Sequence, residues 1–256
     1  MPIDGIMLRA VCDEINRCAA GSRVDKIAQP EKDEVLLFLR AYDAQTHQGC
    51  NMKLLLSADP SAPRVCFSSR SYENLDVPPN FCMLLRKHLT GARLICAEQP
   101  GLERVLVMRF DCRTEMREQT QRNIIIEIMG RCANIFLTSG DGHILGQIRQ
   151  SDLTTGKRPL LPGMKYILPP SQGKSDFLRG RAGCESYAGQ EGLERYLCGS
   201  FVGLSPLVCR EISYRVSGRC DYPCSQLTDD MRAALIRELD KTASIIENSE
   251  YNPVVL

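Results

Sequence analysis

The chain has 256 residues, which is enough for one large domain or two smaller ones with a full hydrophobic core. Hydrophobic residues make up 43% of it and charged residues 25%, a composition typical of water-soluble globular proteins. The net charge of +1 excludes a uniformly basic nucleic-acid-binding protein, so any surface for nucleic acid has to be a local patch.

Most of the chain alternates short apolar runs with turn residues, which predicts an antiparallel sheet. A helix is predicted first, over residues 4–20, with Asp4 at its N-cap position and Gly21 at its end. The predicted strands cover residues 23–29, 34–41, 52–58, 64–67, 92–98, 105–110, 123–129, 134–138 and 143–149. No internal repeat is apparent. The pattern indicates an α+β fold with a mostly antiparallel sheet.

A short basic helix is predicted between these strands, after the Pro78–Pro79 pair. Its apolar stripe leaves Arg86 and Lys87 outside, with His88 partly packed. These three cationic side chains are candidates for contacts with RNA phosphates. The simpler alternative is a solvated helix face, and the sequence does not decide between the two.

Prolines and polar residues indicate a linker at about residues 172–190, so we place one domain at residues 1–175 and another at residues 190–256. The second is expected to be all-helical. Its string FVGLSPLVCREI fits a helix–hairpin–helix, in which Gly203 allows the tight turn and backbone N–H groups face a phosphate. A last amphipathic helix is predicted at about residues 228–248.

Cysteine is unusually frequent, with thirteen residues. The sequence starts without a secretory signal peptide, and no apolar run approaches the roughly 18 residues of a membrane helix. We therefore expect a cytoplasmic protein whose reduced thiols serve as small buried hydrophobic side chains. No CxxC pair is present and the histidines are scattered, so we expect neither a metal site nor another cofactor.

Several strings resemble one protein family: PPNFCMLLRKHLTGARL, GLER and IEIMGRCANIFLT, with PIDGIML before them and LLPGMKYILPP after them. They are similar to the NFACT family, which comprises bacterial RqcH, also called fibronectin-binding protein A, and its eukaryotic relatives. The resemblance implies an Fpg/MutM-like NFACT-N domain followed by a helix–hairpin–helix region. Family members continue into a coiled coil, so the resemblance also implies that this chain is an N-terminal portion.

The resemblance further implies a function in ribosome quality control. Family members bind the large (50S) ribosomal subunit carrying a stalled peptidyl-tRNA, and they recruit tRNA for untemplated tailing of the nascent chain. The implied partners are therefore tRNA and the large subunit, with no membrane and no small-molecule substrate.

Five residues are candidates for tRNA binding. Glu103 and Arg104 match the family's acidic–arginine motif, which implies contact with the anticodon arm, although Glu replaces the usual Asp. Without the resemblance, this pair would be surface charges at the start of a strand. Asp4 matches an acidic family position and is equally a sound N-cap. Arg131 either orients Glu103 or contacts RNA directly, and Glu127 on the same hairpin is a further candidate.

No P-loop, GxSxG or paired Cys–His signature is present, so we expect no covalent active site of the chain's own. Two alternatives to ribosome quality control remain open. An Fpg/Nei-like DNA-binding protein or glycosylase would use Pro2 as its nucleophile, but Ile3 stands where those enzymes have glutamate, and no zinc finger follows. A fibronectin-binding adhesin is implied by the older family name, without a signal peptide or anchor to support it.

Overall fold

The computed structural model describes residues 3–43, 48–73, 75, 77–114, 116, 118–150, 158–170 and 173–252. Pro2, the nucleophile of the glycosylase alternative, lies outside these residues. The chain divides into two compact units. The first contains Val11–Gln99 and Arg104–Pro169, while the second contains Pro170–Leu256 together with two early segments, Asp4–Ala10 and Pro100–Glu103. The linker predicted at residues 172–190 divides the chain at one place, so it did not predict that two early segments belong to the second unit.

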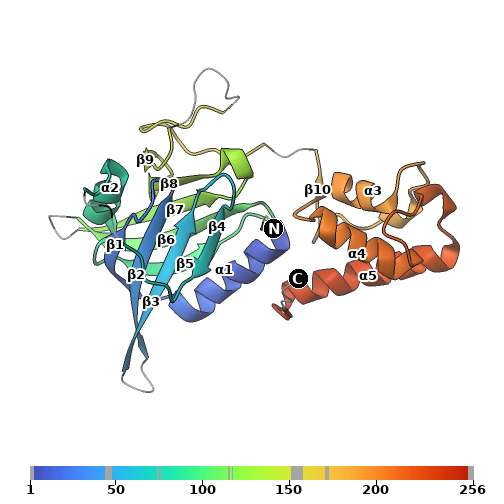
Figure 1. Cartoon of the computed structure of the whole chain (residues 1–256), viewed down its shortest axis with the longest axis horizontal. Helices are drawn as coiled ribbons and strands as arrows, with labels where there is room; N and C mark the ends of the chain where they lie inside the picture. Colours follow the sequence, from blue (N-terminus) through green and yellow to red (C-terminus); the bar gives the residue numbers. More distant parts are fainter. Residues whose placement is uncertain are drawn as a thin grey trace. The chain divides into compact units, whose positions relative to one another are not determined.

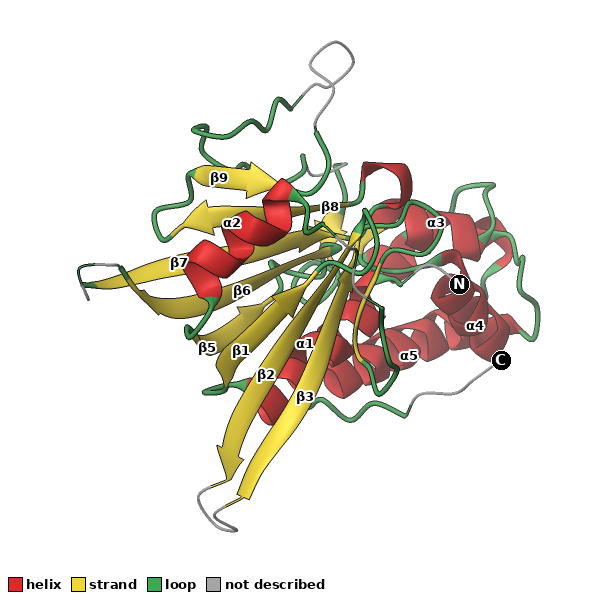
Figure 2. Ribbon diagram, turned by 60° about the vertical axis from the view of Figure 1, so that its left-hand side comes forward, coloured by secondary structure: helices red, strands yellow, loops and turns green. Residues whose placement is uncertain are grey.

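A nine-stranded antiparallel sheet dominates the first unit (Figures 1 and 2). The helices α1 (Gly5–Ala19) and α2 (Asn80–Leu89) each precede a run of strands. The strands are β1 (Arg23–Ala28), β2 (Glu34–Asp43), β3 (Gln48–Ser57), β4 (Arg64–Phe67), β5 (Arg93–Glu98), β6 (Val105–Arg113), β7 (Gln119–Glu127), β8 (Asn134–Ser139) and β9 (Ile144–Gln147). Their order in the sheet is β4-β3-β2-β1-β5-β6-β7-β8-β9. The predicted α+β class with a large antiparallel sheet is confirmed.

The expectation of no internal repeat is wrong. Strands β1–β4 follow one another outward on one side of the sheet and β5–β8 do so on the other, with β9 added at that edge, and residues 70 positions apart occupy equivalent places. Gly21 and Gly91 end the two helices with φ angles of +82° and +83°. Buried positions correspond as well: Val11 with Phe81, Ile15 with Leu85, Ala19 with Leu89, Val24 with Leu94, Ile27 with Ala97, and Gln29 with Gln99. The first unit is thus built from two similar halves.

Hydrogen bonds between the halves repeat in the same way. The Asn16 side chain of α1 donates to the Ala97 carbonyl at 2.8 Å and accepts from its N–H at 2.7 Å. At the equivalent place in α2, Arg86 Nε donates to the Ile27 carbonyl at 2.9 Å. Strands β1 and β5 pair in register only at Arg23 and Arg93. Each helix therefore forms hydrogen bonds with backbone groups of the other half's first strand.

Three helices and a small sheet form the second unit. They are α3 (Leu193–Ser200), α4 (Pro206–Ser217), α5 (Asp229–Glu247) and the parallel pair β10 (Ser175–Asp176) and β11 (Phe201–Val202), which was not predicted. Ser205 caps α4 by accepting from the Val208 N–H at 3.4 Å, and Thr228 caps α5 by accepting from the Met231 N–H at 3.3 Å. The helices enclose a core that includes Phe177, Leu197, Phe201, Ile212 and Leu235.

All thirteen cysteines are free thiols. Six are buried, as predicted: Cys12, Cys82, Cys112, Cys184, Cys209 and Cys224. Burial raises the pKa of Cys112 to about 11, so this thiol stays protonated at neutral pH. The prediction of burial is wrong for four cysteines that are exposed: Cys18, Cys50, Cys132 and Cys220.

Candidate nucleic-acid interface

Glu103 lies in a braced turn, Pro100–Glu103, between β5 and β6. The Glu103 N–H donates to the Pro100 carbonyl at 3.0 Å, and Gly101 has a φ of +55° that suits glycine. The guanidinium of Arg9 donates to the Gly101 carbonyl. Sequence reasoning missed Arg9, because nothing local connects it to a turn 92 residues later. The half-buried Glu103 thus belongs to a turn whose backbone is held from two sides.

This turn is one of three segments of the second unit that are far apart in the sequence and meet in the structure. The Gly5 N–H donates to the Gly203 carbonyl at 3.1 Å. Leu102 is 1% exposed, and a Cβ added to either Gly5 or Gly203 would collide with it. Three of the predicted residues therefore lie on or next to one contact: Asp4, Glu103 and Gly203.

Asp4 and Gly203 each have a structural role at or next to this contact. The Asp4 carboxylate accepts from the Met7 N–H at 2.8 Å, which confirms the predicted N-cap. Gly203 has a φ of +89° and packs against Leu102, so the position requires glycine for its conformation and for space. Phosphate binding at this hairpin stays a prediction.

Arg104 and Arg131 lie at the same end of the sheet in the first unit. The Arg104 carbonyl accepts from the Ile128 N–H at 2.8 Å, two residues before the short 3-10 helix Gly130–Cys132 that carries Arg131. Both arginines are exposed, and within the described residues neither guanidinium forms an ion pair. Whether Arg131 orients Glu103 or contacts RNA directly stays a prediction.

Glu127 differs from the other candidates because it is buried, with 1% of its surface exposed. Arg158 Nη2 lies 2.7 Å from both of its carboxylate oxygens, and the Tyr166 hydroxyl donates to one of them at 2.7 Å. Burial, followed by the Glu127 carboxylate, raises the pKa of Tyr166, which keeps that hydroxyl a donor. The carboxylate is engaged inside the unit. Glu127 therefore fixes the end of β7 before Arg131 instead of contacting RNA itself.

The three cationic residues predicted on α2 have separate roles. Arg86 is held by the Ile27 carbonyl, as described above, so it is part of the packing between the two halves. His88 is half-buried, and burial followed by the positive charges of Arg122 and Lys87 lowers its pKa, so the ring is neutral at pH 7. Lys87 is exposed and remains the residue of this group that suits a phosphate contact.

Within the described residues, no group of three or more His, Cys, Asp and Glu side chains is placed to hold a metal ion. Among the same residues, no helix combines the length and apolarity that a membrane span requires.

The family model described as NFACT N-terminal and middle domains matches residues 4–256. The chain is 38% identical over 226 residues to the protein named Rqc2 homolog RqcH from Bacillus subtilis (strain 168), which covers 84% of this chain and 38% of that protein. The Homo sapiens protein named ribosome quality control complex subunit NEMF is 30% identical over 144 residues, 56% of this chain and 12% of NEMF. The chain thus spans less than half the length of these relatives.

Solved structures share the fold. The crystal structure of the N-terminal domain of fibronectin-binding protein PavA from Streptococcus pneumoniae is 31% identical with a TM-score of 0.73, covering 82% of this chain and 78% of that one. The N-terminal part of the fibronectin/fibrinogen-binding protein from Streptococcus suis is 27% identical with a TM-score of 0.76, covering 93% and 84%.

Proposed function

Because the chain belongs to the NFACT family, we propose that it acts in ribosome quality control. It binds the large ribosomal subunit carrying a stalled peptidyl-tRNA and recruits tRNA for untemplated tailing of the nascent chain. The observation that carries this proposal is the identity of 38% to RqcH along 84% of the chain, which spans both units. The protein then acts in the cytoplasm and positions tRNA, while the ribosome performs peptidyl transfer.

The geometry supports Glu103 and Arg104 as the contact with tRNA. An exposed arginine can stack on an unpaired base or donate two hydrogen bonds to a phosphate or guanine, and a carboxylate can accept from a base amino group. The backbone of both residues is already fixed, Glu103 by the Pro100 carbonyl and Arg104 by the Ile128 N–H. Binding therefore orders only side chains, which lowers its entropic cost.

Arg131 and Lys87 extend the proposed interface. Both are exposed cations of the first unit, and Arg131 lies at the same sheet end as Arg104. We assign them phosphate contacts, which position RNA without reading its sequence. In the second unit, we propose that α3 and α4 with the turn at Gly203 act as a helix–hairpin–helix, and that the whole scaffold is Fpg/MutM-like.

Sequencing the RNA that co-purifies with the protein from cells tests the proposal directly. We expect enrichment of tRNA and of large-subunit ribosomal RNA over total cellular RNA, and loss of the tRNA enrichment in Arg104→Ala. Recovery of neither RNA class would contradict the proposed function. Arg237→Ala, an exposed arginine on α5, serves as the matched control.

Fibronectin binding is the second candidate, because the titles of the similar solved structures name it. A solid-phase assay with purified fibronectin distinguishes the two functions. If the chain binds fibronectin tightly and retains no RNA, adhesion replaces ribosome quality control as the better account.

A further inference from the structure

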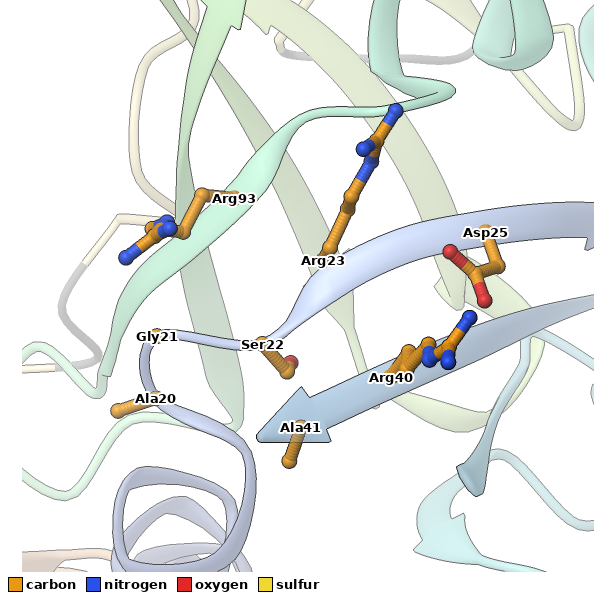
Figure 3. Close-up of a pocket in the computed structure, with 8 residues that line it drawn as sticks. All are labelled: Ala20, Gly21, Ser22, Arg23, Asp25, Arg40, Ala41 and Arg93. Carbon is orange, nitrogen blue, oxygen red and sulfur yellow. The ribbon is translucent and has the colours of Figure 1, made fainter. Parts of the chain in front are cut away.

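Three arginines stand side by side on neighbouring strands of the first unit. Arg23 of β1 is the register partner both of Arg40 on β2 and of Arg93 on β5. All three side chains are exposed, and Figure 3 shows their guanidinium groups fanned apart above adjacent strands. We call Arg23, Arg40 and Arg93 the arginine row.

The arginine row is unfavourable for the sheet by itself. Like charges directly opposite each other on neighbouring strands repel and destabilise the pairing. Within the described residues, none of the three guanidinium groups forms an ion pair that would offset this repulsion. A local conflict of this kind is expected at functional sites, where binding a partner relieves it.

Two cavities adjoin the row and share Arg23 and Arg93. The first, of about 610 Å³, also includes Arg40 and Gly21 in its lining (Figure 3). The second, of about 980 Å³, also includes Lys87, Arg113 and Gly91. Since Gly21 and Gly91 are equivalent positions of the internal repeat, the two cavities are related by the same symmetry. Recessed surfaces of one sign concentrate electrostatic potential, which favours a ligand of opposite charge.

Positive charge exceeds negative charge across both cavities. The five cationic side chains that line them are Arg23, Arg40, Arg93, Lys87 and Arg113. Two carboxylates face them, Asp25 in the first cavity and Asp111 in the second, where Asp111 is also the register partner of Arg93. His88 lines the second cavity as a neutral ring, since burial, Arg122 and Lys87 lower its pKa. The excess of three positive charges suits a ligand with several negative charges.

We propose that the arginine row and its two cavities bind phosphates of an RNA backbone. Guanidinium groups donate paired hydrogen bonds to phosphate oxygens, a geometry that an ammonium group does not offer. The described lining residues include no Phe, Tyr or Trp on which bases would stack, so the contact does not depend on sequence. The inference rests on the proposed function, which supplies the RNA, and adds a surface on β1, β2 and β5 outside the family motif, which Lys87 of α2 adjoins.

The double variant Arg23→Gln/Arg93→Gln tests this site. Filter binding of unfractionated tRNA is measured at a series of salt concentrations. We expect weaker binding, by about five-fold or more, and a shallower salt dependence, because each lost phosphate contact lowers the slope by roughly 0.7. The melting temperature without RNA should stay the same or rise, because the repulsion between strands is relieved. The variant Arg23→Lys/Arg93→Lys should keep the salt slope while losing part of the affinity.

The matched control is Arg237→Gln/Lys241→Gln, which removes two exposed positive charges from α5. We expect its affinity and salt slope to equal those of the wild type. The inference is overturned if wild type binds tRNA and the Arg23/Arg93 variant matches it, if the control loses as much, or if the Gln variant melts several degrees lower. Absence of tRNA binding by the wild type overturns the proposed function and this inference together.

Discussion

The turns that follow β1 and β5 occupy equivalent positions of the internal repeat but differ at their last residue, which, among the described residues, forms an ion pair only in the first. After β1, the turn ends in Asp33 and Glu34, and both are neutralised: Asp33 lies 3.6 Å from Arg149, and Glu34 lies 2.8 Å from Arg64. After β5, the equivalent positions are Glu103 and Arg104, and Arg104 is exposed without an ion pair among the described residues. We call the turn after β1 the closed copy and the turn after β5, where Arg104 is exposed, the open copy, which the proposed function assigns to binding.

The largest loss of stability is expected at Gly203, which packs against Leu102 in the turn after β5. Gly203→Ala places a Cβ against Leu102 and forces a side chain onto a φ of +89°, two penalties that together cost about 3 kcal/mol or more. Urea unfolding should show this loss, while Gly199→Ala in α3, where a Cβ meets nothing within 4 Å, should be neutral or stabilising. Equal stability of the two variants would mean that the Gly203 contact does not support the turn.

The second largest effect is expected for the buried ion pair between Glu127 and Arg158. Glu127→Ala leaves the Arg158 guanidinium without its buried partner, and we expect a loss of about 3 kcal/mol, the lower end for buried pairs because Arg158 is partly exposed. Thermal unfolding measures the loss. At temperatures where the variant is folded, tRNA binding should match the wild type; a specific binding defect in folded protein would return Glu127 to the interface.

Arg104→Ala tests the open copy directly. We expect tRNA binding to weaken about ten-fold, since a good arginine contact with a base is worth about 1–3 kcal/mol. The melting temperature should stay within a few degrees, because an exposed side chain contributes little to folding. Unfolding of the variant, or wild-type affinity, would make this residue structural.

Glu103 sharpens the same test with a conservative change. Glu103→Asp restores the residue usual in the family and should preserve tRNA binding, whereas Glu103→Ala should weaken it. Electrophoretic mobility shifts with unfractionated tRNA rank the two variants. If Glu103→Ala binds as well as Glu103→Asp, the carboxylate does not take part in recognition.

The smallest effect is expected in the closed copy. Asp33→Ala removes a partly exposed ion pair, so we expect a stability loss of at most ~1 kcal/mol and unchanged tRNA binding. A binding defect as large as that of Arg104→Ala would show that the closed turn also takes part in the interface.

Hydrophobic periodicity was sufficient to predict the helices and strands of the first unit, because half-buried strands and amphipathic helices leave a regular pattern. The repeat was not recognised in the sequence because the two halves share few identical residues outside their turns. Identical pairs at the turns are Gly21 and Gly91, and Pro30 and Pro100. A buried strand position requires only an apolar side chain, so the two halves diverged in sequence while keeping their packing.

The candidate site was predictable only in part. Glu103 and Arg104 were found through a resemblance, and their setting depends on contacts that no local pattern reveals. Glu127 contacts Arg158 and Tyr166, which lie 31 and 39 residues later in a proline-rich segment that the sequence predicts to be irregular. The arginine row was missed because its members are adjacent only across strands, whereas in the sequence they are single charges.

The discontinuous second unit has a consequence for synthesis on the ribosome. Leu102 belongs to a core whose other fully buried members begin at Phe177, so most of its partners emerge much later. At typical elongation rates this delay is on the order of ten seconds, during which an apolar side chain of the unit waits uncovered. A fragment ending at Pro169 would leave Leu102 in that condition permanently. Cutting this chain at its apparent boundary is therefore expected to yield a first half prone to aggregation.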